Sequence, residues 1–161
     1  MSIKIGDRIP SAQLTISTEK GPTPVDSADL LGQGRVVLFA VPGAFTPTCS
    51  AQHLPSFIEH FDTLKSRGVD RVVCMAVNDI FVLNAWAKDG GVGDQVLMAA
   101  DGNAEFTGRL GLEMDASAFG MGRRSQRFAM IIENGLVKDL FVEAPGEYRV
   151  SSAEHVAERL A

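Results

Sequence analysis

The spacing of hydrophobic and polar positions changes several times along the chain, and each change predicts a different element. Residues 36–41, 71–77 and 96–100 are nearly continuous apolar runs, which predicts strands that are covered on both faces. Apolar residues three and four apart predict a helix over residues 49–67. Pro55 lies inside that helix and lacks a backbone donor, so we expect a kink or a broken first turn there.

The second half of the chain adds a hairpin and further helices. Asn134-Gly135 accepts positive φ at low cost, so it predicts a tight turn between strands over residues 127–132 and 136–143. The predicted helices run from Asn78-Asp79 to about Lys88, over 104–110, and over 152–160 with Ser151 or Ser152 as the cap. Strands that alternate with helices and end in a hairpin predict an α/β fold with a mixed central sheet.

The two remaining regions carry weaker patterns. The first 35 residues are interrupted by prolines and glycines, so we predict an irregular segment with one short edge strand at residues 14–16. Residues 119–124 are rich in glycine and arginine and predict a loop.

Length and composition narrow the class of protein. The chain has 161 residues, so residues 1–161 are expected to form a single domain. With 45% hydrophobic and 22% charged residues, the chain matches globular proteins and not disordered ones. Acidic residues outnumber basic ones by 20 to 15, a net charge of −5, which argues against nucleic acid as a partner.

The start of the chain and its cysteines point to a reducing compartment. No apolar run resembles a signal peptide, and the longest one, residues 36–45, is about half of a membrane span, so no membrane association is expected. Cys49 and Cys74 are the two cysteines, too few for a disulfide-stapled secreted domain. We therefore expect a cytoplasmic protein whose thiols serve either packing or reactivity.

Cys49 is the first candidate for chemistry because it follows a buried strand and opens a helix. Unpaired N–H groups and the helix dipole favour negative charge at such a terminus, and the thiolate is the nucleophilic form of cysteine. The alternative is a buried structural cysteine. Thr46 offers a hydroxyl three residues earlier, either toward an atom near the sulfur or as a helix cap, while Pro42 and Pro47 stiffen the loop.

The segment Pro42-Gly43-Ala44-Phe45-Thr46-Pro47-Thr48-Cys49 resembles the P-x-x-x-T-x-x-C active-site signature of the peroxiredoxins. Its continuation through Ser50 to His53-Leu54-Pro55 resembles the type II, or fifth, subfamily in particular. The resemblance extends through residues 77–82, the turn at 101–103, Arg123-Arg124 and Arg127-Phe128, and so covers nearly the whole chain.

The resemblance implies a thioredoxin-like fold and a thiol peroxidase that reduces hydrogen peroxide and organic (alkyl) hydroperoxides. Cys49 is then the peroxidatic nucleophile, which becomes a sulfenic acid. Thr46 positions the peroxide, Pro42 shields the pocket, and Arg127 supplies positive charge as the O–O bond breaks. A solvated role is expected for both Arg123 and Arg124, with Arg124 at most a secondary member of the pocket. No metal and no organic cofactor are expected.

The resemblance also implies partners. Type II members with two cysteines carry the resolving one near the C-terminus, whereas this chain has Ser151 and Ser152 there. Cys74 lies in the middle of an apolar strand and is interpreted as a buried, inert thiol, with a resolving role as the alternative. An external thiol is then the reductant: glutathione with glutaredoxin first, thioredoxin second. A homodimer with its interface near the active-site loops is also implied; Phe45 and Phe119 are candidates for that contact or for the core.

The same residues allow other interpretations. His53 shares a helix face with Cys49, which makes a Cys–His hydrolase dyad conceivable. Cys49, His53 and Cys74 lack a fourth ligand and a recognised spacing for a metal site. A general thiol–disulfide oxidoreductase would carry C-x-x-C where this chain has Thr46-Pro47-Thr48-Cys49. A redox-switched holdase that uses Cys49 is the remaining hypothesis.

Overall fold

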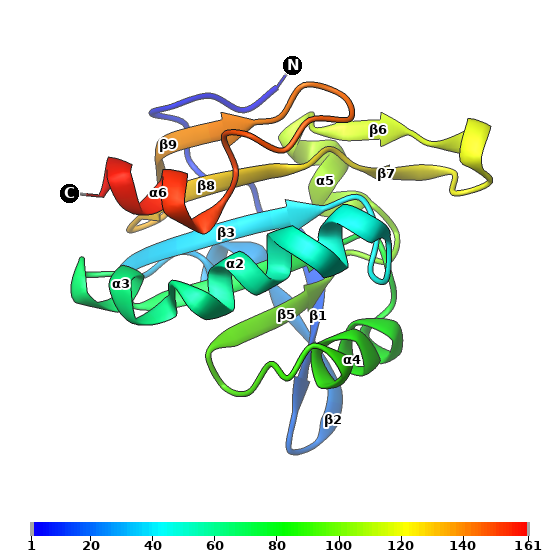
Figure 1. The fold of residues 1–161 in the computed structure, drawn as a ribbon, viewed down its shortest axis with the longest axis horizontal. Helices are drawn as coiled ribbons and strands as arrows, with labels where there is room; N and C mark the ends of the chain where they lie inside the picture. The colour runs from blue at the N-terminus through cyan, green and yellow to red at the C-terminus, as the bar shows by residue number, and fades with distance from the viewer. Residues whose placement is uncertain (1, 161) are drawn as a thin grey trace.

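A mixed seven-stranded sheet forms the centre of the molecule in the computed structural model, which describes residues 2–160 (Figure 1). The strand order is β2-β1-β5-β4-β3-β8-β9. The bounds of the strands are β1 Gln13–Thr18, β2 Gly21–Asp26, β3 Arg35–Val41, β4 Arg71–Ala76, β5 Val96–Ala100, β8 Phe128–Glu133 and β9 Leu136–Val142. The central strands β3, β4 and β5 are parallel, while the strands on either side of them run antiparallel. The predicted mixed α/β sheet is confirmed.

Helices cover both faces of the sheet, which explains the continuous apolar runs. In β3, Val37, Phe39 and Val41 face one hydrophobic cluster, whereas the alternate residues face the other. The first face is covered by a π-helical turn η1 (Cys49–His53) and by α2 (Leu54–Glu59), α3 (Phe61–Ser66), α4 (Ile80–Asp89) and α6 (Ala153–Arg159). The opposite face is covered by α1 (Ser27–Leu30), α5 (Glu105–Leu110) and the N-terminal segment. None of the helices within residues 2–160 is both long and apolar enough to cross a membrane.

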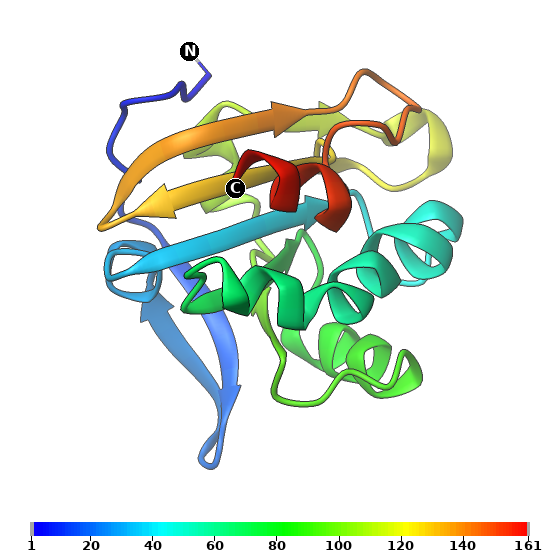
Figure 2. The same ribbon diagram turned by 60° about the vertical axis from the view of Figure 1, so that its left-hand side comes forward.

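The N-terminal prediction was partly wrong, because the strand expected at residues 14–16 is present as β1 but lies between β2 and β5 and is not the edge strand. The segment expected to be irregular forms a β1–β2 hairpin, which Figure 2 shows extending away from the rest of the sheet. Pro22 and Pro24 suggested a loop, yet both lie in β2, where they pair with Ser17 and Thr15. They are tolerated because β2 is the edge strand, so its outward backbone positions need no ladder donor.

The prediction of a plain loop for the glycine- and arginine-rich segment, residues 119–124, was also wrong. Residues 113–125 contain two short antiparallel strands, β6 (Glu113–Asp115) and β7 (Arg123–Ser125), with a 3₁₀ turn, η2 (Ser117–Phe119), between them. An ion pair of 3.1 Å joins Arg123 to Glu113 across the strands. Strands of three residues are too short to show a two-residue period, so the sequence pattern did not reveal them.

The helix predicted over residues 49–67 is divided twice. The expected disturbance before Pro55 is confirmed, because the chain forms the wide turn η1 and then enters α2 with Pro55 in its first turn. A second break, which was not predicted, lies at His60 between α2 and α3. The C-terminal elements follow the sequence pattern: Asn134 and Gly135 have positive φ in the β8–β9 turn, and Ser152 caps α6.

Candidate active site

Cys49 is fully buried where η1 begins, after the loop that leaves the end of β3. The N–H of Leu54 bonds the carbonyl of Cys49, five residues earlier, which makes this turn π-helical. Pro55 has no N–H and its ring crowds the preceding turn, so an ordinary α-helical ladder cannot continue through this position. Such single π turns often occur at functional sites.

The loop between β3 and η1 is held by its own hydrogen bonds. The Thr46 hydroxyl donates to the Gly43 carbonyl at 2.7 Å, and the Ala44 N–H donates to Oδ1 of Asn78 at 3.0 Å. Phe45, which is exposed, adopts a left-handed φ of 64°, a conformation that non-glycine residues seldom adopt. Pro42 is half-buried directly after β3. The loop is therefore a constrained segment that leads into the buried cysteine.

Arg127 lies 78 residues after Cys49 in the sequence and contacts its sulfur. It stands immediately before β8, and its Nη2 donates to Cys49 Sγ at 3.1 Å. Its Nη1 lies 2.8 Å from Nδ1 of His53, and its guanidinium lies 6.0 Å from the centre of the Tyr148 ring. A permanently charged donor therefore lies in direct contact with the sulfur.

His53 is buried and uses both of its ring nitrogens. Nε2 lies 2.9 Å from the carbonyl oxygen of Ser151, and Nδ1 faces Arg127. Burial, and after it the charge of Arg127, lower the pKa of His53 to about 3, against a smaller upward effect of the Ser151 carbonyl and Glu143. With Arg127 on Nδ1 and Ser151 on Nε2, no nitrogen is left to act as a base toward Cys49, which argues against the hydrolase dyad.

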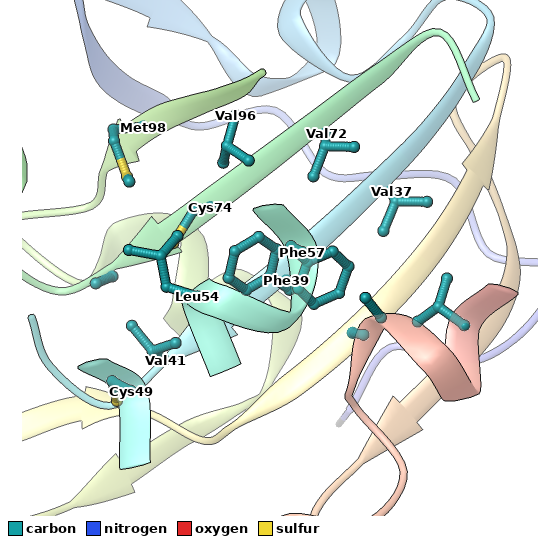
Figure 3. Close-up of a cluster of buried hydrophobic side chains, with 14 of the residues drawn as sticks. Val37, Phe39, Val41, Cys49, Leu54, Phe57, Val72, Cys74, Val96 and Met98 are labelled. Atoms are coloured by element: carbon teal, nitrogen blue, oxygen red, sulfur yellow. The ribbon is translucent and has the colours of Figure 1, made fainter. Parts of the chain in front are cut away.

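Cys74 lies in β4 within the same hydrophobic cluster as Cys49. Figure 3 shows its side chain among Leu54, Met98 and Val96, and both cysteines are free thiols. Burial raises the pKa of the Cys74 thiol well above its ordinary value, and the negative charge of Cys49 raises it further. Cys74 is therefore a poor nucleophile in this conformation.

The other candidates are placed as follows. Arg124 is half-buried, with Nε donating to the Met121 carbonyl at 2.8 Å, while Arg123 is exposed. Within residues 2–160, no cluster of three histidine, cysteine or acidic side chains could hold a metal ion. Sequence reasoning placed His53 beside Cys49 but missed its contact with Arg127, and it missed the contributions of Ser151 and Tyr148 altogether.

The arrangement suits attack by an anionic sulfur on a small polar molecule. The buried site excludes bulk water, which strengthens the interaction between the sulfur and the guanidinium. The same guanidinium can donate to an atom on which negative charge develops next to the sulfur.

Comparisons with known proteins agree with this chemistry. The family model Redoxin matches residues 4–157. Peroxiredoxin-2E, chloroplastic, of Arabidopsis thaliana is 43% identical over 99% of this chain and 70% of its own length. Peroxiredoxin-2B of the same plant is 43% identical over 98% of both chains. The structure of reduced Prx3 from Vibrio vulnificus in complex with hydrogen peroxide is 48% identical, covers 99% of both chains and superposes with a TM-score of 0.95.

These similarities extend over nearly the whole chain and confirm the thioredoxin-like fold implied by its active-site signature. The relatives are named as peroxiredoxins, which are thiol-dependent peroxidases. The chain therefore belongs to the Redoxin family and is a type II peroxiredoxin, an enzyme that reduces peroxides with thiols.

Proposed function

We propose that Cys49 is the peroxidatic residue and that Arg127 activates both the sulfur and the peroxide. The observation that carries this assignment is the 3.1 Å contact between Arg127 Nη2 and Cys49 Sγ at the start of a helical turn. Lowering the basicity of a thiolate also lowers its nucleophilicity, so stabilising the thiolate alone does not make a fast enzyme. The additional rate comes from donors that stabilise charge on the peroxide in the transition state.

The chemical step needs no cofactor. The Cys49 thiolate attacks one oxygen of hydrogen peroxide or an alkyl hydroperoxide, so that an S–O bond forms while the O–O bond breaks. The leaving oxygen departs as hydroxide or alkoxide and takes a proton to become water or an alcohol. Sulfur is oxidised to sulfenic acid and the peroxide is reduced.

Thr46 and Pro42 shape the place where the peroxide binds. The Thr46 hydroxyl donates its hydrogen bond to the Gly43 carbonyl, so the lone pairs of its oxygen are free to accept a hydrogen bond from the peroxide. Pro42 offers no N–H and covers the end of β3 with an apolar ring. Because Cys49 is fully buried, peroxide and reductant reach the sulfur only after its surroundings open to expose it.

An external thiol completes the cycle in this proposal. It attacks the sulfenic sulfur, releases water and forms a mixed disulfide; a second thiol then regenerates Cys49. Near the C-terminus, where two-cysteine type II members carry the resolving cysteine, this chain has Ser151 and Ser152, and Cys74 is buried and protonated. Glutathione with glutaredoxin is the first candidate reductant and thioredoxin the second. A cytoplasmic location suits a protein with two free thiols.

A homodimer is the proposed assembly. Three large apolar side chains are strongly exposed near the active-site loop: Phe45 (52%), Phe81 (69%) and Phe119 (82%). Their segments adjoin one another, because Ala44 bonds Asn78 near the start of α4, and the space beside Gly43 is bounded by Met121 and Arg124. Exposed aromatic side chains on neighbouring segments are typical of a contact surface between proteins.

A stoichiometric reaction tests the assignment of Cys49. Reduced protein receives one equivalent of peroxide, sulfenic acid is trapped with a dimedone-type reagent, and the mass is read under non-reducing conditions. A trapped adduct on Cys49, formed far faster than on free cysteine, supports an external reductant. A Cys49–Cys74 disulfide would keep the peroxidase but make Cys74 the resolving residue and move thioredoxin ahead of glutaredoxin.

A further inference from the structure

We propose that His53 is a positioning residue that holds Arg127 on the sulfur of Cys49, and that the segment from Glu143 to Ser151 holds His53 in turn. This inference rests on the catalytic role proposed for Arg127. The chain of contacts is continuous: Arg127 Nη2 meets Cys49 Sγ at 3.1 Å, Arg127 Nη1 meets His53 Nδ1 at 2.8 Å, and His53 Nε2 meets the Ser151 carbonyl at 2.9 Å.

The partners of His53 settle where its proton lies. A carbonyl oxygen only accepts hydrogen bonds, so Nε2 carries the proton and donates it to Ser151. A guanidinium only donates, so Nδ1 presents its lone pair to Arg127. His53 is therefore a neutral acceptor whose tautomer is set by the chain itself, and the fixed ring plane directs the guanidinium toward Cys49.

A neutral acceptor has an electrostatic advantage over the usual carboxylate partner of arginine. Within residues 2–160, no carboxylate forms an ion pair with Arg127. A carboxylate at the position of His53 would fix the guanidinium equally well but would cancel much of its charge. With histidine there, the full positive charge remains available to the thiolate and to the oxygen that leaves the peroxide.

Glu143 explains how the Ser151 carbonyl is kept in place. Its buried carboxylate accepts from the N–H groups of Arg149, Val150 and Ser151 at 2.8–2.9 Å and from the Ser151 hydroxyl at 2.7 Å. Burial raises the pKa of Glu143, but these hydrogen bonds outweigh it and leave the pKa below its ordinary value. The ionised carboxylate thus gathers residues 149–151 into one rigid turn beside His53.

Two substitutions of His53 separate positioning from packing. In His53→Asn the amide oxygen can take the place of Nδ1 and accept from Arg127. In His53→Gln the longer amide can reach the place of Nε2 and donate to Ser151, but it offers little to Arg127. Both variants lose the ring contacts with Phe39, Phe57 and Tyr148, and Asn, the smaller side chain, leaves the larger cavity, so packing alone would not favour His53→Asn.

The rate constant with hydrogen peroxide is measured for both variants by competition against a haem peroxidase. We expect His53→Asn to react about tenfold faster than His53→Gln, since a small misplacement of a catalytic group costs this much or more. The thiolate fraction of Cys49, read from alkylation by iodoacetamide at a fixed pH, should follow the same order. Equal rates in the two folded variants, or the reverse order, would overturn the inference.

Further variants distinguish a failure of the role proposed for Arg127 from a failure of the role proposed for His53. Glu143→Gln, which removes the charge that gathers residues 149–151, should slow the reaction in the wild-type background but not further in His53→Gln. If Arg127→Ala retains the wild-type rate, the role proposed for Arg127 fails. If Arg127→Ala is slow while His53→Asn and His53→Gln react equally fast, only the role of His53 fails. Thermal melting of each variant establishes that it is folded before its rate is compared.

Discussion

The buried, uncharged His53 should make the enzyme lose stability in mild acid. In the unfolded chain its pKa is near the ordinary value of 6.5, whereas in the folded protein burial and the charge of Arg127 lower the pKa to about 3. Because the folded-state pKa is depressed, its contribution to stability is complete above pH 6.5 and is lost as the pH falls toward 3. The unfolded state gains a proton that the folded state cannot accept.

The size of the effect follows from these two pKa values. Each pH unit between them removes about 1.4 kcal/mol from the free energy of unfolding. Between neutral pH and pH 5, His53 alone therefore costs about 2 kcal/mol. This is a large share of the roughly 5–15 kcal/mol by which a typical domain is stable.

Urea unfolding followed by tryptophan fluorescence measures this loss. Trp86 is the single tryptophan, it is buried in α4, and its Nε1 donates to Ser50 in η1 at 3.0 Å, so it reports on the folding of the site. His53→Asn is the matched control, because it lacks the titrating group while retaining His60, His155 and all carboxylates. The difference in unfolding free energy between wild type and His53→Asn should shrink by about 2 kcal/mol from neutral pH to pH 5. A difference that stays constant over this range would refute a neutral, buried His53.

Four other substitutions test the remaining assignments. Cys49→Ser should abolish peroxide turnover in a coupled assay, because a neutral hydroxyl replaces the thiolate; residual turnover would move the nucleophile elsewhere. Arg127→Ala should lower the rate constant with peroxide by about 10²–10³, as measured for the loss of one transition-state donor, and a loss below tenfold would contradict its catalytic role. Cys74→Ser should keep most of the activity but lower the free energy of unfolding by about 1–3 kcal/mol, because a hydroxyl replaces a buried thiol; near-complete inactivation would overturn the inert assignment. Phe119→Asp should shift the mass in sedimentation toward the monomer, whereas Ile5→Asp, at another exposed apolar residue, should not; equal behaviour of the two would argue against this dimer surface.

The sequence by itself determined the sheet and the position of the proposed nucleophile, Cys49. The strands β3, β4 and β5 are buried on both faces. Such strands are apolar at consecutive positions, so the local sequence is enough to predict them. Cys49 follows β3 in the chain, so its place at the end of a strand was also local information. Pro55 predicted the irregular turn because proline lacks the N–H that would bond the carbonyl four residues earlier, which is a local effect.

Only the tertiary structure decided the surroundings of that nucleophile. Arg127 meets Cys49 across 78 residues, and His53 meets Ser151 across 98, so no local spacing encodes either contact. Both arise because β8 pairs with β3 and the segment after β9 returns over η1. The edge strand β2 and the short β6–β7 pair escaped prediction for a different reason, because each pairs with a neighbouring segment of the chain. Pro22 and Pro24 interrupt the strand pattern of β2, and strands of three residues are too short to show a two-residue period.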